Sequence, residues 1–197
     1  MTSKLTYVER EYLEDFIETD VCWKAIRDHY GDKKAERSGI PLIHHIVEGL
    51  MILTRIKAKR SIRQAWCLHP IVQSDDDLKA AIRMGIPVNF GQQHIQALLL
   101  AMEYRHVANS FLSHHDGIEF KVIRDKVNAI PGIREMLIAD KIQNWKDFSA
   151  QPRGTYLNED RLDIYFNEWC YDILHLGASV VGDLTDLITH GKGDDEE

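Results

Sequence analysis

Apolar residues recur every three or four positions along most of the chain, and this period constrains the fold more than any other feature. The longest stripe lies between Asp160 and about His190 and consists of Leu162, Phe166, Trp169, Ile173, Leu176, Val180, Leu184 and Leu187. A period of 3.6 residues is typical of amphipathic helices, whereas the two-residue alternation of half-buried strands is scarce in this sequence. We therefore predict an all-α fold.

Capping and turn residues divide this pattern into separate helices. Thr6, with Glu9 three residues later, predicts a capping box at the start of a first helix that continues to about His29. The residue before Pro70 is disfavoured in a helix, so a helix is expected to end there. The expected helices cover about 6–29, 42–56, 61–68, a short segment from 75, 92–112, 131–148 and 160–190. The last is expected as one long or kinked helix, with Gly177 and Gly182 as its weak points.

Length and composition indicate one ordinary soluble domain. The chain has 197 residues, and we expect a single helical domain over 1–190 followed by a frayed acidic tail over 191–197. The formal net charge of −7 disfavours binding to a nucleic-acid duplex or to an anionic membrane surface. Three scattered cysteines without a CxxC pair indicate buried thiols, and no signal peptide or membrane-spanning run is present. We therefore expect a cytoplasmic protein.

Three residues far apart in the sequence could meet as metal ligands. His45 follows an apolar run, His69 ends the helix expected over 61–68, and Asp140 lies beside the apolar stripe of the helix expected over 131–148. A carboxylate near an apolar face is unfavourable unless it is paired or bound to a cation. Taken singly, each residue fits a buried ion pair or a core histidine at least as well. Together, two imidazoles and a carboxylate suit a divalent cation that activates water.

The sequences around these residues resemble the HD superfamily. They read Arg-Ser-Gly-x-Pro-(x)3-His up to His45, Leu-His at His69, and Leu-x-Ala-Asp-Lys-x-x-Asn around Asp140. The resemblance is closest to the ppGpp hydrolases, meaning the hydrolase domain of SpoT/Rel proteins and the small MESH-type alarmone hydrolases. It covers about Lys33 to Trp169, and the separation of 24 positions from His45 to His69 is similar to that branch.

The resemblance implies a helical HD-like bundle, here with an added N-terminal helix and a long C-terminal helix, around one divalent metal. That metal is commonly manganese, with iron, cobalt and zinc as alternatives, and its ligands would be His45, His69 and Asp140. Asn144 and the basic loop that contains Lys34 and Arg37 would contact the substrate, although these basic residues could equally be solvated. The implied function is that of a metal-dependent phosphohydrolase acting on a nucleotide, with a (p)ppGpp-like pyrophosphate as one candidate.

Two departures from the family pattern bear on this function. Pro70 stands where the Asp of the His-Asp pair is expected, and Gln73-Ser74 replaces the acidic pair that positions the attacking water in the alarmone hydrolases. General acid–base assistance contributes about 10²–10⁴-fold in rate, so its loss would matter. Asp75 or Asp76 is the predicted catalytic substitute, with Asp77 and His44 as alternatives.

These departures leave two further functions open. A degenerate HD domain would bind a nucleotide or a protein without turning it over. Other HD branches supply a third alternative, a 5′-nucleotidase or deoxynucleotide triphosphohydrolase. The apolar stripe near the C-terminus is also compatible with a homo-oligomer.

Other motifs add weaker candidates. Arg105, on the helix expected over 92–112, could bind a phosphate bidentately or form a surface ion pair with Glu103. Trp145 or Tyr104 could stack on a base. The literal His-Asp dipeptide in 113–117 comes 70 residues after His45, too late for the family pair. No GxxxxGK[ST], GxGxxG, HExxH or GxSxG motif occurs.

Overall fold

Helices make up the regular structure of the described residues, and no strand occurs among them. The computed structural model describes residues 4–35, 39–83, 85, 94–107, 125, 127–150, 154 and 159–190. The helices are α1 (Tyr7–Thr19), α2 (Val21–Tyr30), α3 (Ile43–Arg55), α4 (Arg60–Leu68), α5 (Asp75–Arg83), α7 (Ile95–Val107), α9 (Ile133–Ser149), α10 (Glu159–Asn167) and α11 (Ala178–His190). A 3₁₀ turn, η1 (His69–Val72), continues α4, and a π-helical segment, η4 (Glu168–Ile173), continues α10. The prediction of an all-α fold is confirmed.

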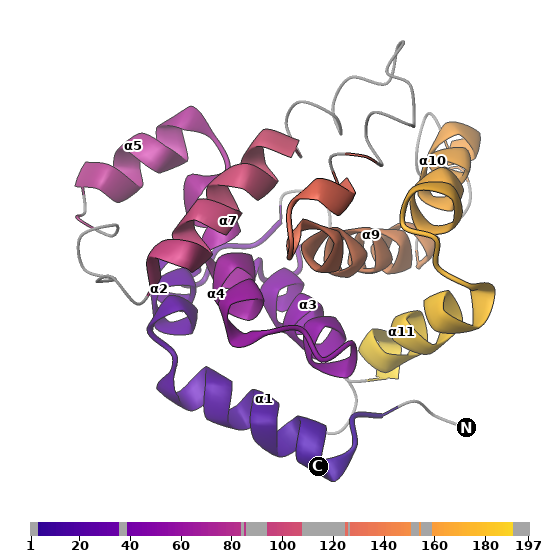
Figure 1. Ribbon diagram of the computed structural model, residues 1–197, viewed down its shortest axis with the longest axis horizontal. Coiled ribbons are helices and arrows are strands. Elements are labelled where there is room, and N and C mark those ends of the chain that lie inside the picture. Colours follow the sequence, from indigo (N-terminus) through magenta and orange to yellow (C-terminus); the bar gives the residue numbers. More distant parts are fainter. Residues whose placement is uncertain are drawn as a thin grey trace.

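Helices α3 and α4 lie in the middle of the molecule, and the other helices surround them (Figure 1). α4 packs against α2 and α7, while α3 packs against α1, α9 and α11. Every residue from Ile62 to Leu68 is buried, so α4 is enclosed on all sides. A helix surrounded in this way can carry side chains toward a site in the interior.

The first expected helix is broken at Asp20, so the prediction of one helix to about His29 is wrong. The capping box at its start is confirmed, because Thr6 Oγ1 accepts a hydrogen bond from the Glu9 amide at 3.3 Å and the Glu9 carboxylate accepts one from the Thr6 amide at 2.8 Å. Asp20 has an extended backbone, and its carboxylate accepts from the Cys22 amide at 2.9 Å. Its side chain therefore caps a second helix and ends the first.

The C-terminal segment expected as one long or kinked helix is divided into separate helices, and the break falls beside Gly177, one of its two expected weak points. α10 widens into the π-helical η4, and α11 begins only at Ala178. Between them, His175 adopts a positive φ of 52°, and the Leu176 amide donates back to the Cys170 carbonyl at 2.9 Å. The positive φ and this hydrogen bond end the η4 segment, so the chain changes direction before α11. Helix α11 then packs against α3 and α9, as Figure 1 shows. The ends of the helix expected over 92–112 and the tail over 191–197 lie outside the described residues.

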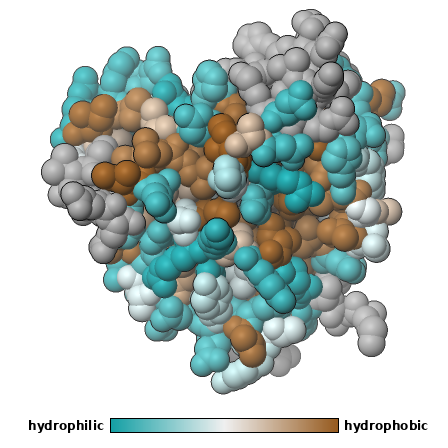
Figure 2. Space-filling model, viewed as in Figure 1, coloured by the Kyte–Doolittle hydropathy of each residue, from teal (hydrophilic) through white to brown (hydrophobic). Residues whose placement is uncertain are grey.

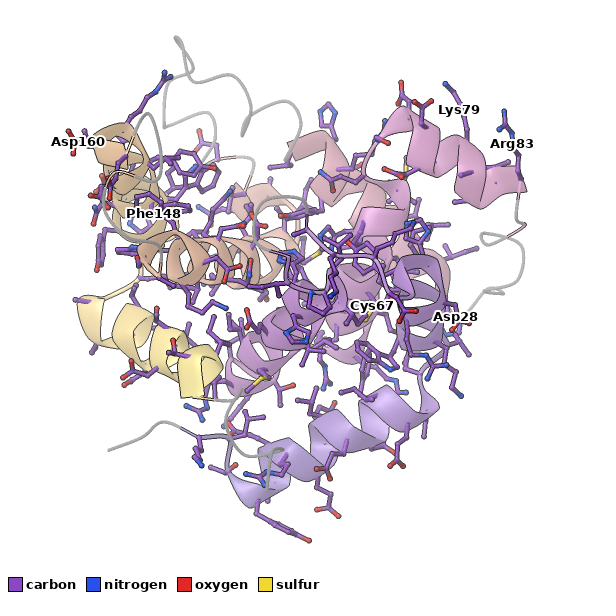
Figure 3. The ribbon with its side chains drawn as sticks, turned by 180° about the vertical axis from the view of Figure 1, so that it is seen from behind. Asp28, Cys67, Lys79, Arg83, Phe148 and Asp160 are labelled. Atoms are coloured by element: carbon purple, nitrogen blue, oxygen red, sulfur yellow. The ribbon has the colours of Figure 1, made fainter. Side chains whose placement is uncertain are left out.

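The three cysteines are free and buried, as the sequence predicted. Cys67 lies in the interior of the bundle, while Lys79 and Arg83 project outward from α5 (Figure 3). Burial raises the pKa of the Cys67 thiol well above its usual range. The thiol is therefore neutral and a poor nucleophile.

The surface combines charged residues with scattered apolar ones. Apolar residues gather over the part of the face in Figure 2 where α5 and α7 lie. These two helices carry the exposed side chains of Ile82, Ile95 and Leu99. In the part of the chain that the structure describes, no helix combines the length and apolar content needed to cross a bilayer.

Gly49 is required by the close approach of α3 to Trp66. A Cβ atom at position 49 would overlap the Trp66 indole ring. The indole Nε1 donates to the Ile46 carbonyl of α3 at 3.1 Å, which holds the ring in this place. Glycine in a helix interior lowers helix stability by about 1 kcal/mol relative to alanine. Here the missing side chain leaves the space that the buried Trp66 ring occupies.

We expect Gly49→Ala to lower the free energy of unfolding by about 1–3 kcal/mol, because the added methyl group overpacks the α3–α4 contact. Denaturant unfolding measures this change. Gly182→Ala is the matched control, since no heavy atom lies within 4 Å of its added Cβ. The control should gain up to about 1 kcal/mol from helix propensity. Equal effects of the two substitutions would contradict the role assigned to Gly49.

Candidate functional site

A cavity of about 300 Å³ opens between the central helices, and its walls contain the residues that the sequence motifs single out. His45 comes from α3, His69 is the first residue of η1, and Asp140 and Asn144 come from α9. The complete lining consists of Tyr30, His45, His69, Pro70, Gln73, Tyr104, Asp140 and Asn144. The fold thus brings together three segments that lie far apart in the sequence.

Trp66 positions both histidines. Its ring centre lies 5.0 Å from that of His45 and 4.4 Å from that of His69. The two imidazole centres are 5.7 Å apart, and the Tyr104 ring lies edge-on to His69 at 5.2 Å. These ring contacts form one wall of the cavity.

His69 is neutral at physiological pH. Its side chain is 6% exposed, and burial, with a smaller contribution from the charge of His45, lowers its pKa to about 3. The Nδ1 atom lies 2.6 Å from the Trp66 carbonyl oxygen, which can only accept a hydrogen bond. Neutral His69 therefore carries its proton on Nδ1, and Nε2 is left as a hydrogen-bond acceptor or metal ligand.

Asp140 is bonded to neighbours on both of its carboxylate oxygens. Oδ1 accepts from the Asn144 amide at 2.9 Å, Oδ2 lies 3.0 Å from Lys141 Nζ, and the Tyr104 hydroxyl also hydrogen-bonds to this carboxylate. Burial raises the pKa of Asp140, but the charges of Lys141 and His45 outweigh it and leave the pKa lowered. The carboxylate is therefore ionised and already solvated by the protein.

Lys141 supplies the compensating charge from inside the bundle. Its ammonium group donates to the Tyr165 hydroxyl at 2.8 Å and lies over the Trp169 ring at 5.0 Å. Burial lowers the pKa of Lys141, but Asp140 and Tyr165 raise it more, so the group stays charged. The protein thus neutralises Asp140 without an external cation.

The predicted metal ligands share a cavity without forming a three-ligand group. Among the described residues, no three His, Cys, Asp or Glu side chains are arranged so that they could hold a metal ion. Pro70 lines the cavity but offers no side-chain donor. A cation that used Asp140 would have to compete with its bonds to Lys141, Asn144 and Tyr104, so the residues as arranged do not fit a preformed metal centre.

The predicted catalytic aspartates lie on the surface of α5, and neither lines the cavity. Asp75 is 78% exposed and pairs with Arg105, while Asp76 is 95% exposed and lies 3.3 Å from Lys79 Nζ. Asp77 accepts from the Ser74 amide at 3.2 Å and so caps the start of the helix. In this arrangement the three carboxylates stabilise α5.

The predicted substrate contacts are placed unevenly. Asn144 lines the cavity, and Arg105 lies beside it, because Arg105 Nε donates at 3.1 Å to the carbonyl of the cavity residue Gln73. Lys34 is exposed, and its backbone forms an isolated antiparallel β-bridge with Pro41. Arg37 and the His-Asp dipeptide in 113–117 lie outside the described residues.

A second cavity of about 280 Å³ adjoins the first, because Asn144 lines both. Its other walls are Lys141, Asp147, Phe148, Leu162, Tyr165 and Phe166. Phe148 lies where α9 meets α10 (Figure 3). Trp145, a predicted stacking residue, packs against Phe166 and Tyr171 and lines neither cavity, whereas Tyr104 lines the first.

Several residues of the site were not predicted. Tyr30 closes the cavity from the end of α2, and burial raises its pKa to about 12. Gln143 contacts His45, and Glu48 and Lys146 contact each other behind it. A sequence signal existed for Glu48, which is a single carboxylate within the otherwise apolar run from Ile46 to Leu53.

Comparison with known proteins adds no family assignment. No protein-family model, curated protein or solved structure matches this chain.

The lowered pKa of His69 predicts a pH dependence of stability. Between about pH 6.5 and pH 3 the unfolded chain binds a proton at this residue and the folded chain does not, so stability is complete above pH 6.5 and is lost as the pH falls. We expect about 2 kcal/mol of this contribution to disappear between pH 7 and pH 5. Denaturant unfolding across this range should show a smaller loss for His69→Asn, with exposed His44→Asn as the control. Parallel curves for wild type and His69→Asn would contradict the assignment.

Proposed function

We propose that the protein binds a nucleotide, or a closely related phosphorylated small molecule, in the cavity between α3, η1, α7 and α9, without a metal centre of its own. This is the function of a degenerate HD domain. The order of His45, His69 and Asp140 along the chain and their meeting at one cavity support an HD-like arrangement. One observation carries the proposal: the charge of Asp140 is already neutralised by Lys141. Asp140 shares the cavity wall with the imidazoles of His45 and His69.

The chemistry of the first cavity suits the polar part of a nucleotide. His69 Nε2 can accept a hydrogen bond from a sugar hydroxyl or a base amino group, and the amides of Gln73 and Asn144 can both donate and accept. The rings of Tyr30 and Tyr104 give flat walls. A volume of about 300 Å³ is at the lower end of ligand pockets, which span about 300–1,000 Å³.

The second cavity gives room for a ligand larger than the first cavity holds. Both cavities have mixed walls, and the second contains the rings of Phe148, Tyr165 and Phe166 beside the charged side chains of Lys141 and Asp147. Aromatic side chains stack readily on planar bases. The exposed Lys34 belongs to the segment that follows the cavity residue Tyr30, where it is available to a phosphate group. Arg105 lies beside Gln73 but already pairs with Asp75, so a phosphate would have to displace that carboxylate.

Binding is tested by thermal stabilisation with a panel of nucleoside mono-, di- and triphosphates and inorganic pyrophosphate, with either EDTA or Mn²⁺ present. We expect at least one nucleotide to raise the Tm equally in both conditions, without release of phosphate. Asn144→Ala should weaken this binding about tenfold, because it removes one hydrogen-bonding group from both cavities. Asn167→Ala, on the exposed side of α10, is the matched control. The absence of any nucleotide-dependent shift would contradict the proposal.

A metal-dependent phosphohydrolase is the second candidate, and the histidines favour it. The Nδ1 atoms of His45 and His69 both lie against side-chain or backbone oxygens, at 2.8 Å and 2.6 Å. Metal-binding histidines usually have this kind of support at their other nitrogen. His45, His69 and Asp140 would hold the ion if Asp140 gave up its bond to Lys141, and the bound ion would supply charge stabilisation for a phosphate group. Nucleotide binding that requires Mn²⁺ and is accompanied by phosphate release would select this candidate.

Restoring the missing carboxylate tests the role of Pro70. We expect Pro70→Asp to take up manganese, cobalt or zinc in a stoichiometric amount that the natural chain does not bind, because it adds an anionic donor next to His69 in the cavity wall. Metal analysis after gel filtration measures this uptake. Pro70→Asn removes the proline without adding charge and is the control. Equal metal content in wild type and Pro70→Asp would contradict the role assigned to Pro70.

A further inference from the structure

We propose that Gln143 is a positioning residue that sets which nitrogen of neutral His45 carries the proton, and that Glu48, Lys146 and Asp147 hold Gln143 in the required orientation. The inference gives the proposed binding site its acceptor on His45, and in that sense it rests on the proposed function. His45 contributes to the wall of the first cavity from α3, and Glu48 is on the same helix. Gln143, Lys146 and Asp147 are on α9, where Asp147 also lines the second cavity.

The contact between Gln143 and His45 is short and largely enclosed. Gln143 Oε1 and His45 Nδ1 lie 2.8 Å apart, and Gln143 is 4% exposed. An oxygen at this position accepts a hydrogen bond from Nδ1–H, whereas an amide nitrogen would require Nδ1 to be the acceptor. The orientation of one buried amide therefore decides the tautomer of neutral His45.

Two carboxylates decide that orientation. The Gln143 Nε2 group donates to Glu48 Oε2 at 3.3 Å and also to Asp147 Oδ2. An amide nitrogen has two hydrogens, and each has a carboxylate partner here. Turning the amide over would place its oxygen against two anions, so the oxygen stays on the side of His45.

Lys146 keeps the two carboxylates in place. Its Nζ atom lies 2.6 Å from Glu48 Oε2 and 2.7 Å from Asp147 Oδ1. Burial lowers the pKa of Lys146, but its bonds to Asp147 and Glu48 raise it more, so it remains an ammonium ion. A buried carboxylate such as Glu48 is tolerated only with such a partner.

The consequence for the site is a fixed pair of acceptors. Neutral His45 carries its proton on Nδ1, as His69 does through the Trp66 carbonyl, and Nε2 of each ring is left unprotonated. One ring is set by a backbone carbonyl and the other by a side-chain network. Only the second can be changed by substitution without altering the main chain.

The tautomer of His45 is measured by long-range ¹H–¹⁵N correlation of the imidazole nitrogens in the ligand-free protein, well above the ordinary imidazole pKa of about 6.5. His45→Ala assigns the signal. We expect wild type to show one Nδ1–H tautomer, and Gln143→Met to convert it to a mixture in which Nε2–H is populated. Glu48→Gln, which keeps the shape of the network, should produce a smaller shift in the same direction and serves if Gln143→Met does not fold.

Gln64→Met is the matched control. Gln64 is also buried and its amide donates to a carboxylate, Asp20, at 2.9 Å, so it reports the general cost of losing such a bond. It should leave the His45 signal unchanged. An Nε2–H tautomer in wild type, or a wild-type tautomer in Gln143→Met, would overturn the assignment. Because no ligand is added, failure of nucleotide binding leaves this result intact.

Discussion

The contact between Trp66 and Gly49 is the constraint on which the rest of the structure depends. The indole ring fills space that any side chain at position 49 would occupy, and its Nε1 is bonded to the backbone of α3. This single ring sets the spacing of the two central helices. It also contacts both His45 and His69, and the Trp66 carbonyl fixes the tautomer of His69. The packing of the core and the shape of the cavity therefore have the same origin.

Helix α9 provides a second condition, which is electrostatic. It carries Asp140 and Lys141 at the cavity, and Gln143 and Lys146 behind it, and all four are largely removed from solvent. Each ion has an opposite partner within the protein, either on α9 itself or on Glu48 of α3. Buried charges persist only when they are compensated in this way. As a result the cavity presents acceptor nitrogens and amides rather than an unpaired carboxylate, which favours a polar organic ligand over a bare cation.

The sequence predicted the helices well where local signals determine them. Thr6 and Glu9 identified the first capping box, and the motifs around His45, His69 and Asp140 identified residues that share one cavity. Asp20 was missed as a break because an apolar stripe continues across it, although its carboxylate is a local cap for the Cys22 amide. The break at His175 lies next to Gly177, which the sequence marked as a weak point, but the positive φ of His175 itself had no sequence signal. The sequence could not predict the pairing of Asp75 with Arg105 or the contact between Gln143 and His45, because the partners are about 30 or more residues apart in the chain.

His45, His69 and Asp140 line one cavity in which Asp140 is committed to bonds within the protein. Anomalous diffraction at the manganese absorption edge, from a crystal soaked in Mn²⁺, tests this claim most directly. We expect no anomalous peak within bonding distance of all three side chains, with Asp140 still bonded to Lys141. A peak coordinated by both imidazoles and the Asp140 carboxylate would contradict it and would make the site a metal centre.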